Sequence, residues 1–299
     1  MAISRTEYWR IIIAALIVSL LLLWAALGPA AAQAPGDPGA EAELAKEATT
    51  KPDRPEVSAS VDMLSQYIFR GVAFSRHSVV FQPSMTISYK GFAANIWGNF
   101  DTNERNPFGI TNPNRGAAKW NETDFTFSYS REVLKSLTLT GGIIYYALDS
   151  NISSTDSFEV FGGATYAFPW FEAGFSVFRE VGNLPGWYLS WYVSRSFELP
   201  VNIKFLAGKP SLDLLAGWSA EFSNNRNVFP TEDGSLYQSL HAGIISAGLN
   251  IPVHKNVTVT PKIQYWYALG GQSTYTIRTL SWDGTQNHIV GGVSVSTTF

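Results

Sequence analysis

The charged residues with the clearest chemical potential lie in segments where apolar and polar side chains alternate, and they share the polar face. The acids of this face outnumber its two bases, Arg70 and Lys262. If the face lines water, carboxylates in excess attract cations and repel anions. In the alternative interpretation, several of them lie at solvent-screened rims or pair with loop bases, so that their charge selects nothing. The acids expected on this inward face are Asp62, Asp101, Glu122, Asp124, Glu159, Glu172, Glu180, Asp213 and Glu221.

Arg70 is the inward charge for which the sequence makes the most specific prediction. It shares a face with Asp62 at the outer end of the first alternating segment, and Gly71 after it permits a bend. A charge with little access to solvent needs a partner, so we expect Arg70 to pair with an inward carboxylate such as Asp101 or Asp124. A role as a selectivity group in an open lumen is the alternative.

Catalytic chemistry finds little support in the sequence. A lipid-hydrolysing barrel needs a His–Ser pair on its lipid-facing wall, held in a defined geometry. His77 and Ser78 are adjacent and point to opposite faces, whereas His241 and Ser239 share a face that we expect to turn inward. The chain has no cysteine, phosphate loop, metal-ligand cluster or nucleotide fingerprint, so we expect neither enzyme activity nor a cofactor.

Twelve alternating segments must position these residues. In the eighth, Trp187, Leu189 and Trp191 face one way, while Tyr188 and Ser190 face the other. The segment lengths suit tilted strands that cross a membrane, which need roughly 9–11 residues. The stretch 198–210 also alternates, as a long turn, a bulge or a thirteenth strand; odd counts are disfavoured, so we expect twelve. The expected strands are 57–70, 79–90, 92–101, 121–131, 136–148, 156–168, 170–181, 187–197, 212–223, 236–250, 256–268 and 287–299.

The connections alternate between short and long, which is typical of barrels with short periplasmic turns and longer outer loops. Lys90-Gly91 is a tight turn, while 102–119 is a long loop that we expect to fold inward as a constriction. Aromatic residues near the segment ends indicate two interfacial girdles. These are Tyr89, Phe92, Phe168, Trp170 and Phe171 near short turns, and Phe69, Phe100, Trp187, Phe222 and Tyr267 near long loops.

Composition agrees with a membrane barrel. Charged residues make up 15% of the chain and aromatic residues 14%, against a usual charged share of about a quarter. No segment after Leu27 is apolar for long enough to form a membrane helix. A soluble β-sandwich, the alternative, would need charged residues on its second strand faces, which here carry mostly Ser, Thr, Asn, Gln and Gly. The net charge of −3 gives no indication of a nucleic-acid partner.

The N-terminal region has the layout of an export signal. Two arginines precede the apolar run Ile11–Leu27, and Ala30–Ala32 offers a cleavage site. A transmembrane anchor is the alternative. We therefore expect a signal peptide over 1–32, a flexible periplasmic linker over 33–56, which is rich in Ala, Pro, Glu and Lys, and a barrel over 57–299.

One segment resembles a known family. Residues 62–71 carry Ser65, Tyr67, Phe69, Arg70 and Gly71 in the spacing Ser-x-Tyr-x-Phe-Arg-Gly. Gln-Pro follows at 82–83, and Gly-Phe and Trp-Gly follow at 91–92 and 97–98. In these motifs the chain resembles the TorF-like porins, outer-membrane β-barrel proteins of unknown function. The resemblance, which is strongest over 57–101, implies an outer-membrane barrel with a transport role and brings no substrate and no site residues.

Taken together, these features predict a transmembrane antiparallel up-and-down β-barrel of twelve strands in the bacterial outer membrane. We expect a porin-like channel for passive diffusion of ions or small solutes that prefers cations, narrowed by inward aromatic residues. An occluded structural or adhesive barrel and an outer-membrane lipid hydrolase are the alternatives. Expected partners are outer-membrane lipid, periplasmic chaperones and small solutes. The terminal Phe299, by resemblance to outer-membrane barrels, is expected to act as the signal to the barrel-assembly machinery. The inward aromatic residues are Trp97, Tyr146, Tyr188, Tyr192 and Trp266.

Overall fold

The computed structural model describes residues 54–107, 116–149 and 155–299. The expected signal peptide at 1–32 and almost all of the expected linker at 33–56 lie outside these ranges. The middle of the loop that we expected to form a constriction, 108–115, lies outside them too.

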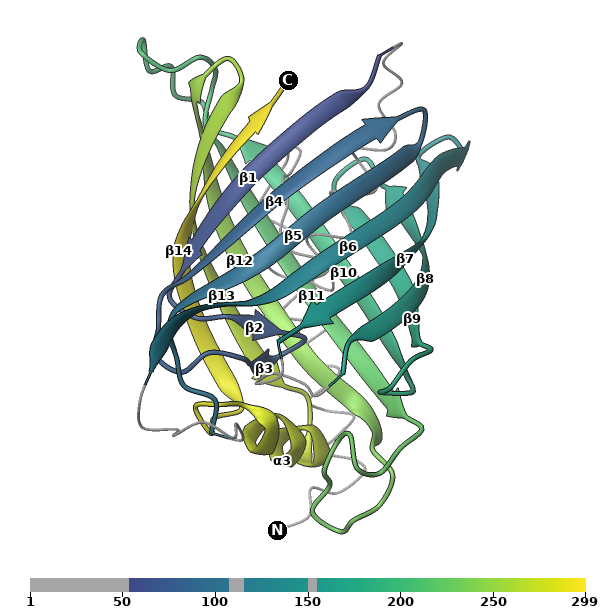
Figure 1. Cartoon of the computed structure of the whole chain (residues 1–299). Helices are drawn as coiled ribbons and strands as arrows, with labels where there is room; N and C mark the ends of the chain where they lie inside the picture. Colours follow the sequence, from purple (N-terminus) through teal and green to yellow (C-terminus); the bar gives the residue numbers. More distant parts are fainter. Residues whose placement is uncertain (1–53, 108–115, 150–154) are drawn as a thin grey trace.

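Within the described residues, twelve strands close into one antiparallel barrel, as predicted (Figure 1). Each strand pairs with its neighbours along the chain, and the first strand pairs with the last, so that every edge is covered. The barrel strands are β1 (Glu56–Leu64), β4 (Val80–Tyr89), β5 (Phe92–Glu104), β6 (Ala117–Leu134), β7 (Leu137–Leu148), β8 (Ser157–Ala167), β9 (Glu172–Glu180), β10 (Gly186–Glu198), β11 (Ser211–Ser223), β12 (Gln238–His254), β13 (Val257–Ala268) and β14 (Asn287–Thr298).

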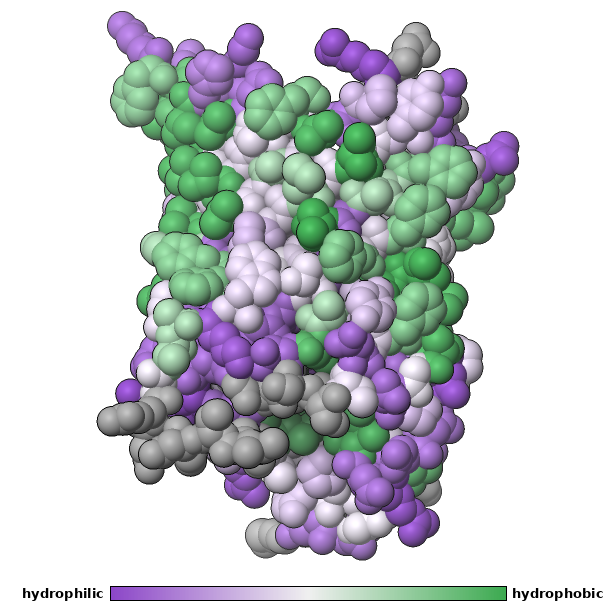
Figure 2. Space-filling model, in the orientation of Figure 1, coloured by the Kyte–Doolittle hydropathy of each residue, from purple (hydrophilic) through white to green (hydrophobic). Residues whose placement is uncertain are grey.

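Alternation along the strands separates an apolar outer face from a polar inner face. In β1, Val61 and Met63 are exposed while Asp62 and Leu64 are buried. Figure 2 shows apolar side chains spread over the upper and middle parts of the visible face, with hydrophilic residues gathered towards the lower end. So much exposed apolar surface suits contact with lipid hydrocarbon. Its members include Phe81, Met85, Ile87, Ile96, Phe125, Phe127, Ile143, Val160, Phe175, Ile263 and Val295.

The two ends of the barrel differ. At one end, called the turn end here, lie the C-terminal residue and tight turns such as Lys90-Gly91, in which both residues have positive φ, at 51° and 92°. Such turns match the twist of paired strands. The opposite, loop end carries most of the long connections, with the exception of 199–210 between β10 and β11 (Figure 1). In the described residues, no helix has the length and apolar character required to cross a bilayer.

The first expected strand, 57–70, is wrong in its second half. β1 ends at Leu64, and the chain then turns into the barrel as a small hairpin of β2 (Ile68–Phe69) and β3 (Val72–Ala73) (Figure 1). We call residues 65–79 the plug. Its apolar side chains include Tyr67 and Val72, which are buried, and burying them inside the barrel removes them from water. Phe69, which we expected in the outer girdle, therefore lies in the interior, where its ring is 5.9 Å from that of Tyr146.

Two further connections bear on the prediction. The sequence alone leaves the stretch 198–210 open and predicts a loop for the link before the last strand. In the described residues, 199–210 forms no strand, because Glu198 pairs directly with Ser211; the stretch is a long turn. The link between β13 and β14, expected to be a loop, contains a helix, α3 (Gly271–Leu280), which lies across the loop end (Figure 1). Ile277 of this helix is fully buried and belongs to the same apolar cluster as Tyr67 and Val72 of the plug.

Candidate functional site in the barrel interior

Small polar side chains line the half of the interior near the turn end. Ser128 pairs across the sheet with Gly142, near the turn that joins β6 to β7, and is buried. Buried hydroxyl groups need a hydrogen-bond partner, and one without a protein partner is normally satisfied by water. This half of the barrel is therefore polar and holds buried hydroxyl groups whose hydrogen-bonding capacity the described residues do not satisfy. They include the hydroxyls of Thr126, Ser128, Ser194 and Ser196.

Apolar and aromatic side chains fill the half near the loop end. The plug packs there against the inner faces of the strands, and the Tyr67 ring lies 5.6 Å from the Trp97 ring. The predicted narrowing aromatics Trp97, Tyr146, Tyr188, Tyr192 and Trp266 are all buried. The cluster around the plug consists of Leu64, Tyr67, Val72, Val80, Trp97, Ala242, Ile244, Trp266, Ile277 and Val290.

The tip of the plug rests on β12. Arg70 and Gly71 form the hairpin turn with φ of 51° and 86°, as a type I′ turn requires. A Cβ atom on Gly71 would lie 2.6 Å from the Cβ of Ala242, so only glycine fits between the turn and the wall. The neighbouring His241 contacts the tip as well, through a hydrogen bond with the Arg70 backbone. Its Nδ1 atom forms a second hydrogen bond, 2.7 Å long, with the Tyr237 hydroxyl.

The Arg70 guanidinium occupies a site formed by four consecutive strands. Its two terminal nitrogens donate to the two carboxylate oxygens of Glu159 on β8, at 2.8 and 2.7 Å. The Tyr146 hydroxyl of β7 donates to the same carboxylate at 2.8 Å. The guanidinium carbon lies 4.0 Å from the ring centroid of Tyr188 on β10 and 5.0 Å from that of Phe178 on β9. We call Tyr146, Glu159, Phe178 and Tyr188 the guanidinium site.

Acidic side chains outnumber basic ones around this site. Glu122, Asp124 and Glu221 are buried. Asp124 interacts electrostatically with Glu122 and Glu159. Glu221 interacts electrostatically with Arg70 and Glu159. Burial by itself lowers the pKa of Arg70, but the charge of Glu159 outweighs it, and the net pKa lies above the ordinary value. Arg70 is therefore a permanent cation among four acidic side chains.

The structure brings together only some of the predicted inward residues. Arg70, Glu122, Asp124 and Glu159 meet around the plug, and the expected ion pair of Arg70 forms, but with Glu159 in place of Asp101 or Asp124. Arg70 reaches β8 because it sits at the plug tip and not on the wall. The other predicted residues have partners of their own: Lys262 pairs with Asp62 at 2.5 Å, Asp213 accepts from Asn250, Glu172 accepts from Tyr192, and Asp101 accepts from the Asn103 N–H. Glu180 lies directly across the sheet from Glu159 and accepts from the Ser157 hydroxyl at 2.9 Å.

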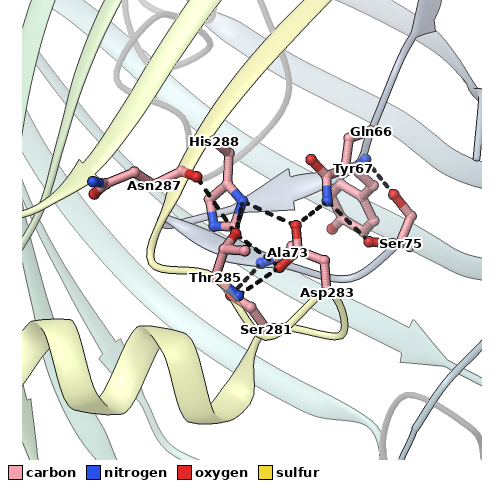
Figure 3. Close-up of polar contacts among 9 residues, drawn as sticks. All are labelled: Gln66, Tyr67, Ala73, Ser75, Ser281, Asp283, Thr285, Asn287 and His288. Atoms are coloured by element: carbon pink, nitrogen blue, oxygen red, sulfur yellow. Dashed lines mark hydrogen bonds and ion pairs between the residues drawn. The ribbon is translucent and has the colours of Figure 1, made fainter. Parts of the chain in front are cut away.

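A second polar cluster, which the sequence did not predict, ties the plug to the loop before β14 (Figure 3). Gln66 donates to Asp283 at 2.7 Å and to the Ser75 carbonyl at 3.1 Å. Asp283 also lies 3.3 Å from His288 Nδ1 and accepts from the Thr285 N–H. We call these five residues the Asp283 cluster. Burial by itself raises the pKa of Asp283, but these hydrogen bonds outweigh it and hold the pKa well below its usual range.

The histidines lie in different surroundings. His77 is exposed, and His241 faces the interior, as we expected. Within the part of the chain that the structure describes, no three His, Asp or Glu side chains are placed to hold a metal ion.

Comparisons with known proteins agree with the architecture. The sequence model of a family described as a bacterial protein of unknown function (Gcw_chp) matches residues 48–187. No curated protein matches the sequence. Among solved structures, an outer membrane channel of the COG4313 group from Pseudomonas putida F1 is similar, with a TM-score of 0.50, 8% identity and coverage of 89% of this chain and 100% of that one.

Two porin structures are similar over a slightly smaller share of the chain. The NanC porin has a TM-score of 0.46 and 11% identity, covering 81% of this chain and 98% of its own. The KdgM porin has a TM-score of 0.43 and 10% identity, covering 82% and 99%. At 8% identity, the likeness to the outer membrane channel extends to the fold alone, a closed antiparallel barrel.

Proposed function

We propose that this protein is an outer-membrane channel for passive diffusion of ions or small solutes, that it prefers cations, and that the plug closes it in the state described here. The resemblance of residues 57–101 to TorF-like porins and the fold shared with outer-membrane channels support this location and role. Export by an N-terminal signal peptide and assembly through Phe299, which is exposed at the turn end, complete the proposal, together with outer-membrane lipid and periplasmic chaperones as partners.

The observation that carries the proposal is the difference between the two halves of the interior. Hydroxyl groups without protein partners line the turn half, whereas a separate segment of chain, not the wall, fills the loop half. A barrel that serves only as a scaffold needs no removable filling. The surplus of buried acidic side chains around Arg70 supports the cation preference, because a narrow, low-dielectric passage strengthens the field of those that are ionised.

An occluded barrel is the second candidate, and one observation favours it. The plug is held by a bidentate ion pair and by the Asp283 cluster, and such anchoring suits a permanent seal. The reversal potential across a KCl gradient in planar bilayers separates the two functions. The wild-type protein is compared with a variant in which residues 66–76 are replaced by a short Gly-Ser linker.

We expect brief, cation-selective openings from the wild type and sustained, cation-selective current from the linker variant. If both proteins insert as folded barrels and both remain silent, the channel proposal is wrong and the occluded barrel is favoured. If current flows without preference for potassium over chloride, the channel stands but its selectivity does not.

A further inference from the structure

We propose that the guanidinium site is a binding site for organic cations that carry a guanidinium group, and that Arg70 occupies it as a tethered ligand. The inference rests on the proposed channel function and names the class of solute that the channel recognises. The first observation is that the four side chains of the site belong to the barrel wall. Tyr146, Glu159, Phe178 and Tyr188 all belong to barrel strands, so they remain in place if the plug moves, while Arg70 leaves with the plug.

The geometry of the site matches a guanidinium group specifically. Two parallel N–H donors of Arg70 meet the two oxygens of Glu159 at 2.8 and 2.7 Å. A planar fork makes both bonds at once, which an ammonium ion does not. The Tyr146 hydroxyl fixes the carboxylate from the other side. The wall therefore supplies the carboxylate and two aromatic faces, and the plug adds only the Phe69 ring, whose centroid lies 4.9 Å from the guanidinium carbon.

Aromatic faces complete the recognition. The guanidinium carbon lies 4.0 Å from the Tyr188 centroid and 5.0 Å from the Phe178 centroid, within the range of cation–π attraction. Phe178 and Tyr188 are themselves buried. A carboxylate beside two aromatic faces, in a setting where water is scarce, is a favourable environment for a weakly hydrated planar cation.

The charges around the site argue for an incoming cation over an anion. Glu122, Asp124 and Glu221 remain on the wall when Arg70 leaves. Asp124 Oδ1 is buried and has no hydrogen-bond partner within the described residues. Withdrawal of Arg70 would leave Glu159 buried without its cation, which is costly. A guanidinium solute removes that cost, so it both competes with Arg70 and stabilises the withdrawn plug.

The test uses the full-length protein in detergent, with methylguanidinium chloride as the probe and equal concentrations of methylammonium chloride and KCl as controls. Thermal unfolding is measured for the wild type, Arg70→Ala and the double variant Arg70→Ala/Glu159→Gln. We expect millimolar methylguanidinium to raise the Tm of Arg70→Ala in a saturable way. The wild type, in which Arg70 fills the site, and the double variant, which lacks the carboxylate, should show no such rise.

A second measurement covers the case in which Arg70→Ala does not fold. The linker variant that replaces residues 66–76 lacks Arg70 but keeps the whole wall, and its potassium current is recorded with methylguanidinium present. We expect saturable block. Tyr188→Leu in the same background should raise the half-blocking concentration about tenfold, since it removes the nearer aromatic face.

The outcomes separate this inference from the channel itself. Saturable binding of methylguanidinium by a barrel that never conducts would support the guanidinium site and contradict the channel function. Current that methylguanidinium does not block more strongly than methylammonium, together with an unchanged Tm of Arg70→Ala, would overturn the site and leave the channel standing.

Discussion

Arg70 and Glu159 lie 89 residues apart in sequence, and their side chains form a bidentate ion pair in the interior of the barrel. Glu159 belongs to the wall and Arg70 to the plug, so this pair is a direct link between the fixed and the separable parts of the molecule. Both side chains are largely buried, at 11% and 4% exposed. The pair therefore influences stability and opening together.

The first prediction concerns the cost of breaking this pair from one side. Glu159→Gln leaves the Arg70 charge buried without its carboxylate, and we expect the free energy of unfolding to fall by about 3–5 kcal/mol. Glu198→Gln is the matched control. Glu198 pairs with Lys209 at the turn end, where both are more than half exposed, so this change should cost about 0–1 kcal/mol.

Urea unfolding of the protein in lipid vesicles measures both values. The double variant Arg70→Leu/Glu159→Leu should recover much of the loss, since removing both charges leaves no uncompensated ion. Equal losses from Glu159→Gln and Glu198→Gln would mean that the interior pair is as well solvated as the surface one.

The second prediction concerns the contact between the plug tip and β12. Gly71→Ala should destabilise the docked plug, because its Cβ would lie 2.6 Å from the Cβ of Ala242 and its φ of 86° is unfavourable for alanine. Gly234→Ala is the control: it has a φ of 69° but no neighbouring atom within 4 Å.

The control carries only the backbone strain, and the difference between the variants therefore reports the close approach. We expect Gly71→Ala to cost about 1–3 kcal/mol more than Gly234→Ala in urea unfolding, and to lengthen open times in planar bilayers. If the two variants unfold at the same urea concentration, the plug tip does not press against the wall.

The barrel was predictable from sequence because alternation is a local property. In β10, Tyr188 is buried and Trp187 exposed, which follows from the period of two without knowledge of any other strand. The turn Lys90-Gly91 was predictable for the same reason. Glu122, Asp124 and Glu159 follow the same alternation, and all three are buried.

The plug was not predictable in this way. Alternation continues beyond Leu64, so it gives no indication that the chain leaves the wall there. That change depends on the interior space available to Tyr67 and Val72, which all twelve strands set together. The partner of Arg70 depends on the same packing. Helix α3 gave little signal either: it has no acidic residue in its first turn and no side-chain cap.

The third prediction concerns acid. Hydrogen bonds from His288, Gln66 and the Thr285 N–H hold the pKa of Asp283 below its usual range against the opposing effect of burial. A lowered pKa contributes stability that is fully present above the ordinary aspartate value of about 3.9. That stability is lost as the pH falls below this value and through the folded-state pKa.

Asp283→Asn removes this contribution. The difference in free energy of unfolding between wild type and Asp283→Asn should therefore shrink as the pH falls below about 4. Urea unfolding in vesicles across this range gives the difference directly. A difference that grows below about pH 4 would show that the carboxylate is destabilised in the folded protein, with the opposite sign of shift.

The fourth prediction uses the absence of cysteine from the chain, which makes every introduced thiol unique. Ser60 and Val61 are neighbours on β1; Ser60 shares the inner face with Asp62 and is half-buried, and Val61 is 45% exposed on the outer face. A charged, water-soluble thiol reagent should modify Ser60→Cys in protein embedded in lipid vesicles, because this side chain lies on the polar inner face and is partly accessible. It should leave Val61→Cys unmodified, because that thiol faces hydrocarbon. A small apolar maleimide should react with Val61→Cys, which verifies that the thiol is intact. Modification of Val61→Cys but not Ser60→Cys by the charged reagent would reverse the assignment of the two faces of the wall.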